Sequence, residues 1–390
     1  MSPELVQRPR LQQQLEYHYG LDEIAAAELS VGVTNLGAQQ IENLVHDVEM
    51  QPEALQKRDD NRRETGRILS GESDKNFIIV GPCSLDNETD DYDKLLDYIE
   101  ELQAENPDAV IAFRANAAKP RTSDGPTGLF NSVNPEDRQL MMDVYREAFK
   151  RGTPILTEIT NINEFNVLGP YLSAMWLGAR DMTSTSLRKL FSATNLPVLV
   201  KNGLDGKAET VESAITAIGS STKNNEGSGV DLGFMASTYL IDGLPAMVSV
   251  GNGNKNVGII ARGHALPKEA GPIQRLRAVR RHIGELCLLS EKVGCTVIID
   301  GSHSVPPMLK IEKGDRNRFP KVLDIIFKAA SQGKIPKFDR VVGLLGEIGT
   351  TEGKTDKNFD MLEEVNRKRI SLHLRRFQRL RTKIQAGASS

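Results

Sequence analysis

The chain has 390 residues, of which 39% are hydrophobic and 26% charged, a composition typical of a soluble globular protein. Its formal net charge of −3 gives no strong attraction to nucleic acid or to a membrane surface, so we expect small-molecule partners. Three cysteines at irregular spacing do not form a disulfide framework, and no apolar run suits a signal peptide or a membrane span. We therefore expect a cytoplasmic protein.

The first 75 residues lack the regular pattern found later in the chain. They are rich in Gln, Glu, Asp and Asn, with helix-like stretches at 21–29 and 38–48. We predict that residues 1–75 form an N-terminal extension that packs on the rest of the protein or on a second subunit. Apolar helix faces such as Ile41–Val48 need burial, which predicts a homo-oligomer.

From Asn76 onward, strand-like and helix-like segments alternate. Short apolar runs typical of buried parallel strands lie at 78–83, 111–115, 155–158, 175–180, 198–203, 258–263, 296–303 and 341–347. Segments with helical spacing follow strand candidates at 91–102, 137–150, 208–218, 274–290, 320–332 and 358–381. This alternation predicts an α/β fold, a (β/α)₈ TIM barrel over 76–383, with a short tail at 384–390.

Each apolar run ends on, or contains near its end, a residue that can bind a metal, a phosphate or a carboxylate. In chain order these residues are Cys83, Arg114, Glu158, Arg180, Lys201, Arg262, His303 and Glu347. All strand C-termini of a parallel barrel open onto one face, where enzymes of this fold hold their active sites. The sequence therefore predicts that these side chains converge on one site.

Cations dominate this predicted face. They are Arg114, Lys119, Arg121, Arg180, Lys201 and Arg262. A single strand-end arginine is usually solvated or ion-paired, but arginine and lysine together suit phosphate and carboxylate oxygens. The set indicates either two phosphorylated substrates or one substrate with several negative groups.

A second set, Cys83, His303 and Glu347, ends the first, seventh and eighth strands, which are neighbours in a closed barrel. Taken alone, each residue is better explained by a structural role in the core or in an ion pair than by metal ligation. A thiolate, an imidazole and a carboxylate together suit a divalent ion such as Mn, Fe, Co or Zn. We favour a metal site.

Short motifs make a family resemblance specific. They are GPCS at 81–84, KPRT at 119–122, GAR at 178–180, KNG at 201–203, VGNG at 250–253, RG at 262–263, IDGSH at 299–303 and GE at 346–347. From about Arg62 to about Glu352 the chain resembles class I 3-deoxy-D-arabino-heptulosonate 7-phosphate (DAHP) synthases. The resemblance implies an aldol-type condensation of phosphoenolpyruvate with erythrose 4-phosphate, the first step of the shikimate pathway.

The resemblance also implies roles for individual residues. The metal ligands would be Cys83, His303 and Glu347. The phosphoenolpyruvate site would be Arg114, Lys119, Arg180, Lys201 and Arg262, with Glu158 lining the pocket and Arg121 and Thr122 holding the sugar phosphate. Lys119, Lys201, His303 and Glu347 would act in catalysis. The N-terminal extension would correspond to a region of subunit contact and feedback inhibition by an aromatic amino acid, although its sequence names no effector.

The segment after the eighth strand departs from the family pattern. The family places a fourth metal ligand, an aspartate, in a longer loop resembling SITDACISW, whereas residues 346–365 read GEIGTTEGKTDKNFDMLEEV. Asp356 is the nearest candidate ligand and Asp360 the next. Asp356 is equally well explained as a residue at a helix N-terminus, where the helix dipole favours a carboxylate.

Substitutions near the substrate leave alternatives to the family reaction open. Asn-Ala-Ala at 116–118 replaces the aromatic and acidic residues that the family has before KPRT. The chain could use another aldose phosphate, such as arabinose 5-phosphate, or be a catalytically silent regulatory subunit. A Schiff-base aldolase using Lys201 is a further alternative, but it would leave the three metal-type ligands without a role.

Overall fold

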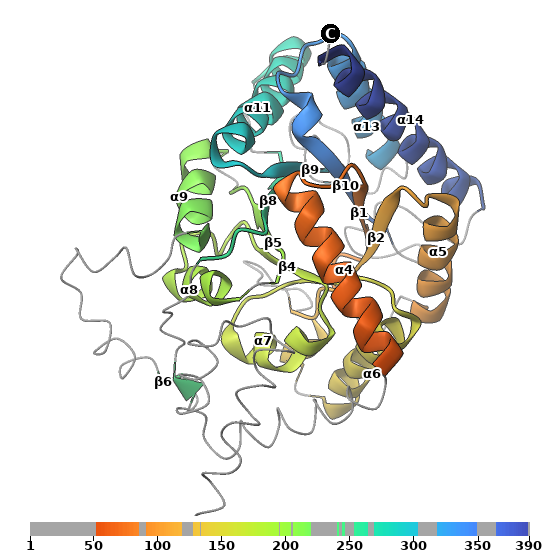
Figure 1. The fold of residues 1–390 in the computed structure, drawn as a ribbon, viewed down its shortest axis with the longest axis vertical. Coiled ribbons are helices and arrows are strands. Elements are labelled where there is room, and N and C mark those ends of the chain that lie inside the picture. The colour runs from red at the N-terminus through yellow and green to blue at the C-terminus, as the bar shows by residue number, and fades with distance from the viewer. Residues whose placement is uncertain are drawn as a thin grey trace, which may run out of the picture.

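The computed structural model describes residues 52–85, 91–118, 128–132, 134–194, 196–203, 206–219, 240–241, 244–245, 253–263, 269–302, 318–348 and 364–388. Eight parallel strands form a closed barrel in the order β1-β10-β9-β8-β5-β4-β3-β2 (Figure 1). The strands are β1 (Asn76–Gly81), β2 (Ala109–Arg114), β3 (Ile155–Glu158), β4 (Ala174–Leu177), β5 (Val198–Lys201), β8 (Val257–Ala261), β9 (Thr296–Asp300) and β10 (Val341–Glu347). The predicted (β/α)₈ barrel is confirmed.

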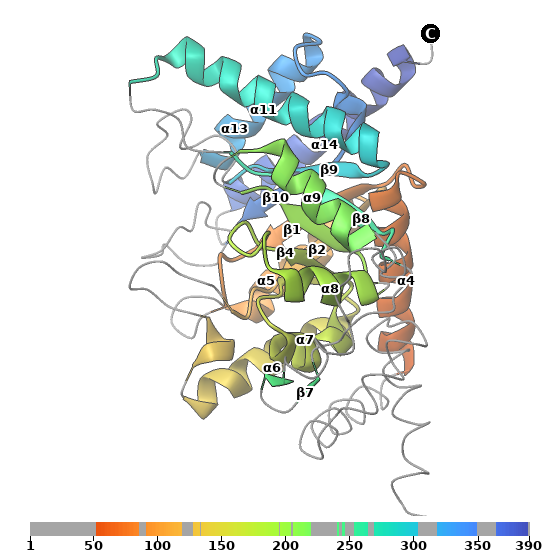
Figure 2. The same ribbon diagram turned by 90° about the vertical axis from the view of Figure 1, so that its left-hand side faces the viewer.

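Helices surround the strands on the outside of the barrel (Figures 1 and 2). They are α5 (Tyr92–Glu105), α6 (Pro135–Arg151), α7 (Ile162–Leu168), α8 (Thr185–Ala193), α9 (Ala208–Gly219), α11 (Pro272–Val293), α13 (Arg318–Ser331) and α14 (Glu364–Ala388). Two short strands, β6 (Leu240–Ile241) and β7 (Leu244–Pro245), pair with each other outside the barrel sheet. Of the helices in the described part, none combines the length and apolar character needed to cross a bilayer.

Helix α6 shows how local sequence sets the ends of an element. Its N-cap Asn134 accepts a hydrogen bond from the backbone N–H of Glu136 at 3.1 Å, and Pro135 occupies the first helical turn. Gly152 ends the helix with a φ of 77°, in the left-handed region that favours glycine. Asn134 and Gly152 therefore set where this helix begins and ends between the second and third strands of the chain.

The strands are buried on both faces, as expected for a barrel wrapped in helices. One cluster, which includes Phe77, Ile79 and Leu345, is separate from the larger cluster shared with the helices, which includes Ile78 and Leu344. Adjacent residues of one strand thus belong to different clusters, and we take the smaller one as the barrel interior. At Gly343, a Cβ atom would collide with the carbonyl oxygen of Phe77, so the close pairing of β1 and β10 requires glycine there.

Helix α4 (Pro52–Ser70) closes the end of the barrel where the strands begin (Figure 2). Its residues Ile68 and Leu69 belong to the interior cluster. The hydroxyl of Thr296, the first residue of β9, donates to the carbonyl of Leu69 at 3.1 Å. Part of the predicted extension therefore packs on the barrel. The helix-like stretches expected at 21–29 and 38–48 lie outside the described residues.

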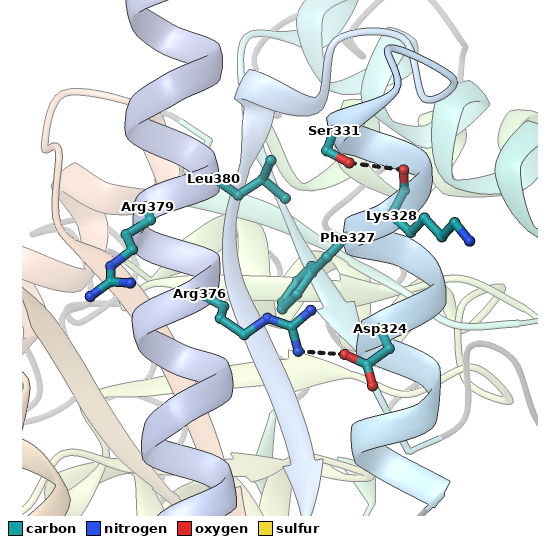
Figure 3. Close-up of a pocket in the computed structure, with 7 residues that line it drawn as sticks. All are labelled: Asp324, Phe327, Lys328, Ser331, Arg376, Arg379 and Leu380. Atoms are coloured by element: carbon teal, nitrogen blue, oxygen red, sulfur yellow. Dashed lines mark hydrogen bonds and ion pairs between the residues drawn. The ribbon is translucent and has the colours of Figure 1, made fainter.

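Helices α13 and α14 pack side by side and leave a cavity of about 640 Å³ between them (Figure 3). Arg376 of α14 pairs with Asp324 of α13 at 2.5 Å, and the rings of Phe327 and Phe377 stack with centroids 5.9 Å apart. Residues of these two helices alone line the cavity, so no strand end contributes to it.

Candidate active site

The closed parallel barrel brings together the strand ends singled out from the sequence. Arg114, Glu158, Lys201 and Glu347 are the last residues of β2, β3, β5 and β10. Cys83 follows β1, Arg180 follows β4, and Arg262 follows β8 directly. Lys119, Arg121, Thr122, His303 and Asp356 lie outside the described residues. The described part of the site therefore consists of the residues at the strand ends and directly after them.

Arg114 at the end of β2 and Glu347 at the end of β10 form a buried ion pair across β1, which lies between these two strands in the barrel. Arg114 Nη1 lies 2.6 Å from Glu347 Oε1, and the two residues are 3% and 0% exposed. Arg114 also donates to the carbonyl oxygen of Cys83 at 3.3 Å. Burial opposes the charge of Arg114, but the negative charges of Glu347, Cys83 and Asp300 outweigh burial and raise the pKa of the guanidinium. Arg114 is therefore a permanent cation.

Lys201 forms a second buried pair, with Asp300 at the end of β9. The distance from Lys201 Nζ to Asp300 Oδ2 is 2.8 Å. Burial lowers the pKa of Lys201, and the charges of Arg262 and Arg114 lower it further, while Asp300 opposes them. Asp300 was not predicted to be a site residue, although an acid that ends an apolar strand inside the IDGSH motif was a usable signal.

The two ion pairs are connected through Ser302. Its backbone N–H donates to Asp300 Oδ1 at 3.0 Å, and its hydroxyl accepts from the backbone N–H of Glu347 at 2.6 Å. The ends of β9 and β10 are thus fixed to each other. This one residue thus holds the carboxylate of Asp300 and the backbone of Glu347 in place.

Two asparagines fix the backbone on either side of these pairs. Asn116 donates to the carbonyl of Cys83 at 3.1 Å and accepts from the backbone N–H of Glu158 at 3.0 Å. Asn202 accepts from the backbone N–H of Arg262, whose carbonyl lies 2.8 Å from Nε2 of the buried His282. Asn116, one of the departures from the family pattern, therefore ties together the segments after β1, β2 and β3.

Glu158 and Arg262 are partly buried and Arg180 is exposed, so the charges of all three can reach a bound molecule. Glu158 fills the space beside Gly178, where a Cβ would collide with its carboxylate. The pKa of Asp181 lies above its ordinary value, because burial and the charge of Glu158 raise it more than Arg180 lowers it. This side of the site carries acids as well as cations.

The donors in the described part of the site suit a metal ion of borderline softness. Strands β1 and β10 are neighbours, and Gly81 of β1 pairs with Glu347 of β10. Cys83 lies two residues after Gly81 and is therefore on the strand end next to Glu347. The Cys83 thiol is close enough to act electrostatically on Arg114, the ion-pair partner of Glu347. A thiolate and a carboxylate belong to the mixed donor set expected for Mn, Fe, Co or Zn. Within the described residues, no group of three His, Cys, Asp or Glu side chains forms a complete metal site, and the predicted third ligand His303 lies outside them.

Comparison with known proteins gives a consistent result. The sequence model of the DAHP synthetase I family matches residues 45–378. The chain is 28% identical over 325 residues to a tyrosine-inhibited phospho-2-dehydro-3-deoxyheptonate aldolase of Candida albicans, covering 80% of this chain and 79% of the relative. It is 30% identical over 311 residues to a tyrosine-inhibited aldolase of the same name from Schizosaccharomyces pombe, covering 76% of this chain and 74% of the relative. A solved phospho-2-dehydro-3-deoxyheptonate aldolase from Francisella tularensis shares the fold, with a TM-score of 0.63 at 21% identity over 86% of this chain and 96% of that one.

Proposed function

The chain belongs to the DAHP synthetase I family as a divergent member, and on that premise we propose that it condenses phosphoenolpyruvate with an aldose phosphate, erythrose 4-phosphate being the first choice. The observation that carries the proposal is the pair of buried cations, Arg114 and Lys201, each held by a carboxylate at the strand ends. Buried cations in fixed positions are suited to binding an anionic substrate without reorganisation.

Charge counting indicates which groups supply the attraction for phosphoenolpyruvate. The four residues Arg114, Glu347, Lys201 and Asp300 are neutral as a set, because two cations face two carboxylates. The net positive charge would therefore come from the rim. We assign this charge to Arg180, Arg262 and Lys119. Arg121 and Thr122 of the KPRT motif would bind the sugar phosphate, Arg121 through its charge and Thr122 through its hydroxyl. Glu158 would line the same pocket.

Cys83, His303 and Glu347 would hold a divalent metal, with Asp356 as a candidate fourth ligand; such an ion polarises an aldehyde oxygen when it is bound. The enol carbon of phosphoenolpyruvate attacks the aldehyde carbon, water adds to the resulting cationic carbon, and phosphate leaves. Lys201, with a lowered pKa and a carboxylate at 2.8 Å, is suited to transfer a proton at a substrate oxygen. Arg114 would hold phosphoenolpyruvate in the position and orientation needed for the attack.

The lowered pKa of Lys201 also supports a second candidate, a Schiff-base aldolase, because an amine must be neutral to attack a carbonyl. The close Asp300 carboxylate argues against it, since that carboxylate stabilises the ammonium form. Borohydride reduction in the presence of substrate distinguishes the two reactions. Covalent trapping on Lys201 supports the Schiff base, and unmodified protein supports the metal-type reaction.

We further propose that residues 1–75 extend the barrel of residues 76–383 and contribute to a homo-oligomer and to a site for an aromatic amino acid effector. Support comes from two sources. Helix α4 packs on the barrel, and the relatives from Candida albicans and Schizosaccharomyces pombe are named for inhibition by tyrosine. Sedimentation of the full chain tests the homo-oligomer, and phosphate release with and without tyrosine or phenylalanine tests the effector site. A monomer at micromolar concentration whose activity ignores tyrosine and phenylalanine contradicts them.

Release of inorganic phosphate tests the proposed reaction. Metal-supplemented protein is incubated with phosphoenolpyruvate and a panel of aldoses that includes erythrose 4-phosphate and arabinose 5-phosphate. We expect turnover with erythrose 4-phosphate that is lost in Lys201→Met. The matched control is Lys292→Met, because Lys292 is an exposed lysine paired with Glu212 at 2.6 Å outside the site. Phosphoenolpyruvate binding without turnover on any aldose phosphate would instead identify a silent regulatory subunit.

A further inference from the structure

Trp176 is the only tryptophan of the chain and lies inside the barrel at the level of the site. It belongs to β4, is 0% exposed, and is a member of the interior cluster. In the strand pairing, Trp176 lies opposite Glu158 of β3 and Leu199 of β5. A large aromatic ring therefore fills the interior just below the strand ends that carry the charged residues.

Both buried cations of the site face this ring. The guanidinium carbon of Arg114 lies 5.4 Å from the ring centroid and the Lys201 Nζ lies 5.9 Å from it. Both distances are within the range of cation–π attraction, which is stronger when the groups are desolvated, as here. Arg114 and Lys201 come from β2 and β5, so Trp176 is a contact that the two cations share.

The ring acts through its face, because the indole Nε1 is buried and has no hydrogen-bond partner among the residues that the structure describes. This has an electrostatic consequence. A third carboxylate in this place would hold the cations, but it would give the otherwise neutral set of Arg114, Glu347, Lys201 and Asp300 a net negative charge and repel an anion. An aromatic face attracts cations and adds no net charge.

We propose that Trp176 is a positioning residue that sets the separation and orientation of Arg114 and Lys201 for an anionic substrate. The identity of that substrate as phosphoenolpyruvate rests on the proposed function, whereas the contact with the two cations does not. Arg114 and Lys201 both lie over the indole ring, so an anion that binds to these two cations changes the electric field at the indole.

The chain provides its own reporter for this proposal, since all tryptophan emission comes from Trp176. The full-length protein is titrated with phosphoenolpyruvate, and separately with inorganic phosphate, while emission and calorimetric heat are recorded. We expect an emission change that saturates with the calorimetric binding curve. Emission that stays constant while calorimetry shows saturation overturns the proposal, and absence of binding by either anion overturns it as well.

Variants test the positioning role independently. Trp176→Leu removes the π face, and we expect the KM for phosphoenolpyruvate to rise about tenfold, with a smaller change in kcat. Trp176→Phe keeps an aromatic face and should restore part of the affinity. Met175→Leu is the matched control, because Met175 belongs to the outer cluster. Equal KM values in the Leu, Phe and unmodified proteins overturn the proposal, and if Trp176→Leu does not fold, the Phe variant and the titration decide.

The role of Trp176 and the proposed reaction can fail independently of each other. Phosphoenolpyruvate that binds and changes the emission without turnover contradicts the reaction and supports the role of Trp176. Turnover with constant emission and an unchanged KM in Trp176→Leu supports the reaction and contradicts the role of Trp176.

Discussion

The ammonium of Lys201 lies 2.8 Å from the carboxylate of Asp300, and both side chains are buried at the ends of β5 and β9. Burial lowers the pKa of Lys201, and Asp300 is the residue that opposes this effect. The charge of the lysine therefore depends on its partner more than that of a surface lysine does. Function at this position is accordingly sensitive to pH.

Asp300→Asn should weaken phosphoenolpyruvate binding in a pH-dependent manner. Without the carboxylate, the pKa of Lys201 falls further, and the neutral form, which cannot attract an anion, becomes populated at lower pH. The affinity of the variant should thus decline with rising pH earlier than that of the unmodified protein. Calorimetric titrations across pH 6 to 9 measure both curves, and superimposable pH profiles would contradict the assignment of Lys201.

Removing one member of the Arg114–Glu347 pair should cost more than removing both. Arg114→Met leaves a buried carboxylate alone, and Glu347→Gln leaves a buried guanidinium alone, each lowering the free energy of unfolding by about 3 kcal/mol. The double variant Arg114→Met with Glu347→Gln leaves neither charge unpaired and should lose less than either single variant. Urea unfolding of all the proteins tests this, and simple additivity would show that the pair is not coupled.

Cys83→Ser should lower metal affinity, most strongly for the softer ions, because the thiolate is the soft ligand of the proposed set. Cys295→Ser is the matched control, since Cys295 is also a buried cysteine but directly precedes β9, at the end of the barrel opposite the site. Metal content after dialysis against zinc and against manganese gives the comparison. Equal zinc content in Cys83→Ser and Cys295→Ser would show that Cys83 is not a ligand.

Asp356→Ala distinguishes two forms of the metal site. If the segment after β10 supplies a fourth ligand, metal content and phosphate release fall together. If water or substrate fills the fourth position, as in open catalytic sites, metal content stays full. We expect a loss of both in Asp356→Ala, and the same measurements on Asp360→Ala show whether the next candidate ligand takes this place instead. Full metal content in both variants would remove Asp356 from the ligand set.

Glu164 makes stability depend on pH. Burial raises its pKa to about 8 from an ordinary value of 4.5, against hydrogen bonds from Thr160 that lower it. The folded protein keeps the proton up to about pH 8, while the unfolded chain releases it near 4.5. The free energy of unfolding should thus fall as pH rises through this window, by roughly 1 kcal/mol per pH unit. Urea unfolding of Glu164→Gln, which has no proton to release, should lack this slope; an unchanged slope would show that another group causes it.

The strands were predictable because each is a short apolar run bounded by turn residues, and all eight occur where the sequence indicated. The helices α7 and α8 were not predicted. With Ile162–Leu168 and Thr185–Ala193 they are too short for a helical period to stand out. Helix α4 was missed because its apolar residues lie only at its two ends, Ala54 and Leu55 at one and Ile68 and Leu69 at the other, so the polar stretch between them shows no helical period.

The sequence was enough to predict which strand ends carry charged residues, but not which of these residues form ion pairs with one another. The sequence placed Arg114, Lys201 and Glu347 on one face, as the barrel requires. It gave no reason to match Lys201 with Asp300 or Arg114 with Glu347, since these partners are distant in sequence. Trp176 was included only as part of an apolar run, because a tryptophan in a strand is usually a core residue.

Phosphorus NMR of the reaction mixture tests the central proposal most directly, because it follows both phosphoryl groups at once. Metal-supplemented protein is mixed with phosphoenolpyruvate and erythrose 4-phosphate, with Lys201→Met as the blank. The proposed condensation predicts that the phosphoenolpyruvate signal is replaced by an equal amount of inorganic phosphate, while a new sugar phosphate replaces erythrose 4-phosphate. Persistence of both substrate signals under these conditions would contradict the proposed reaction.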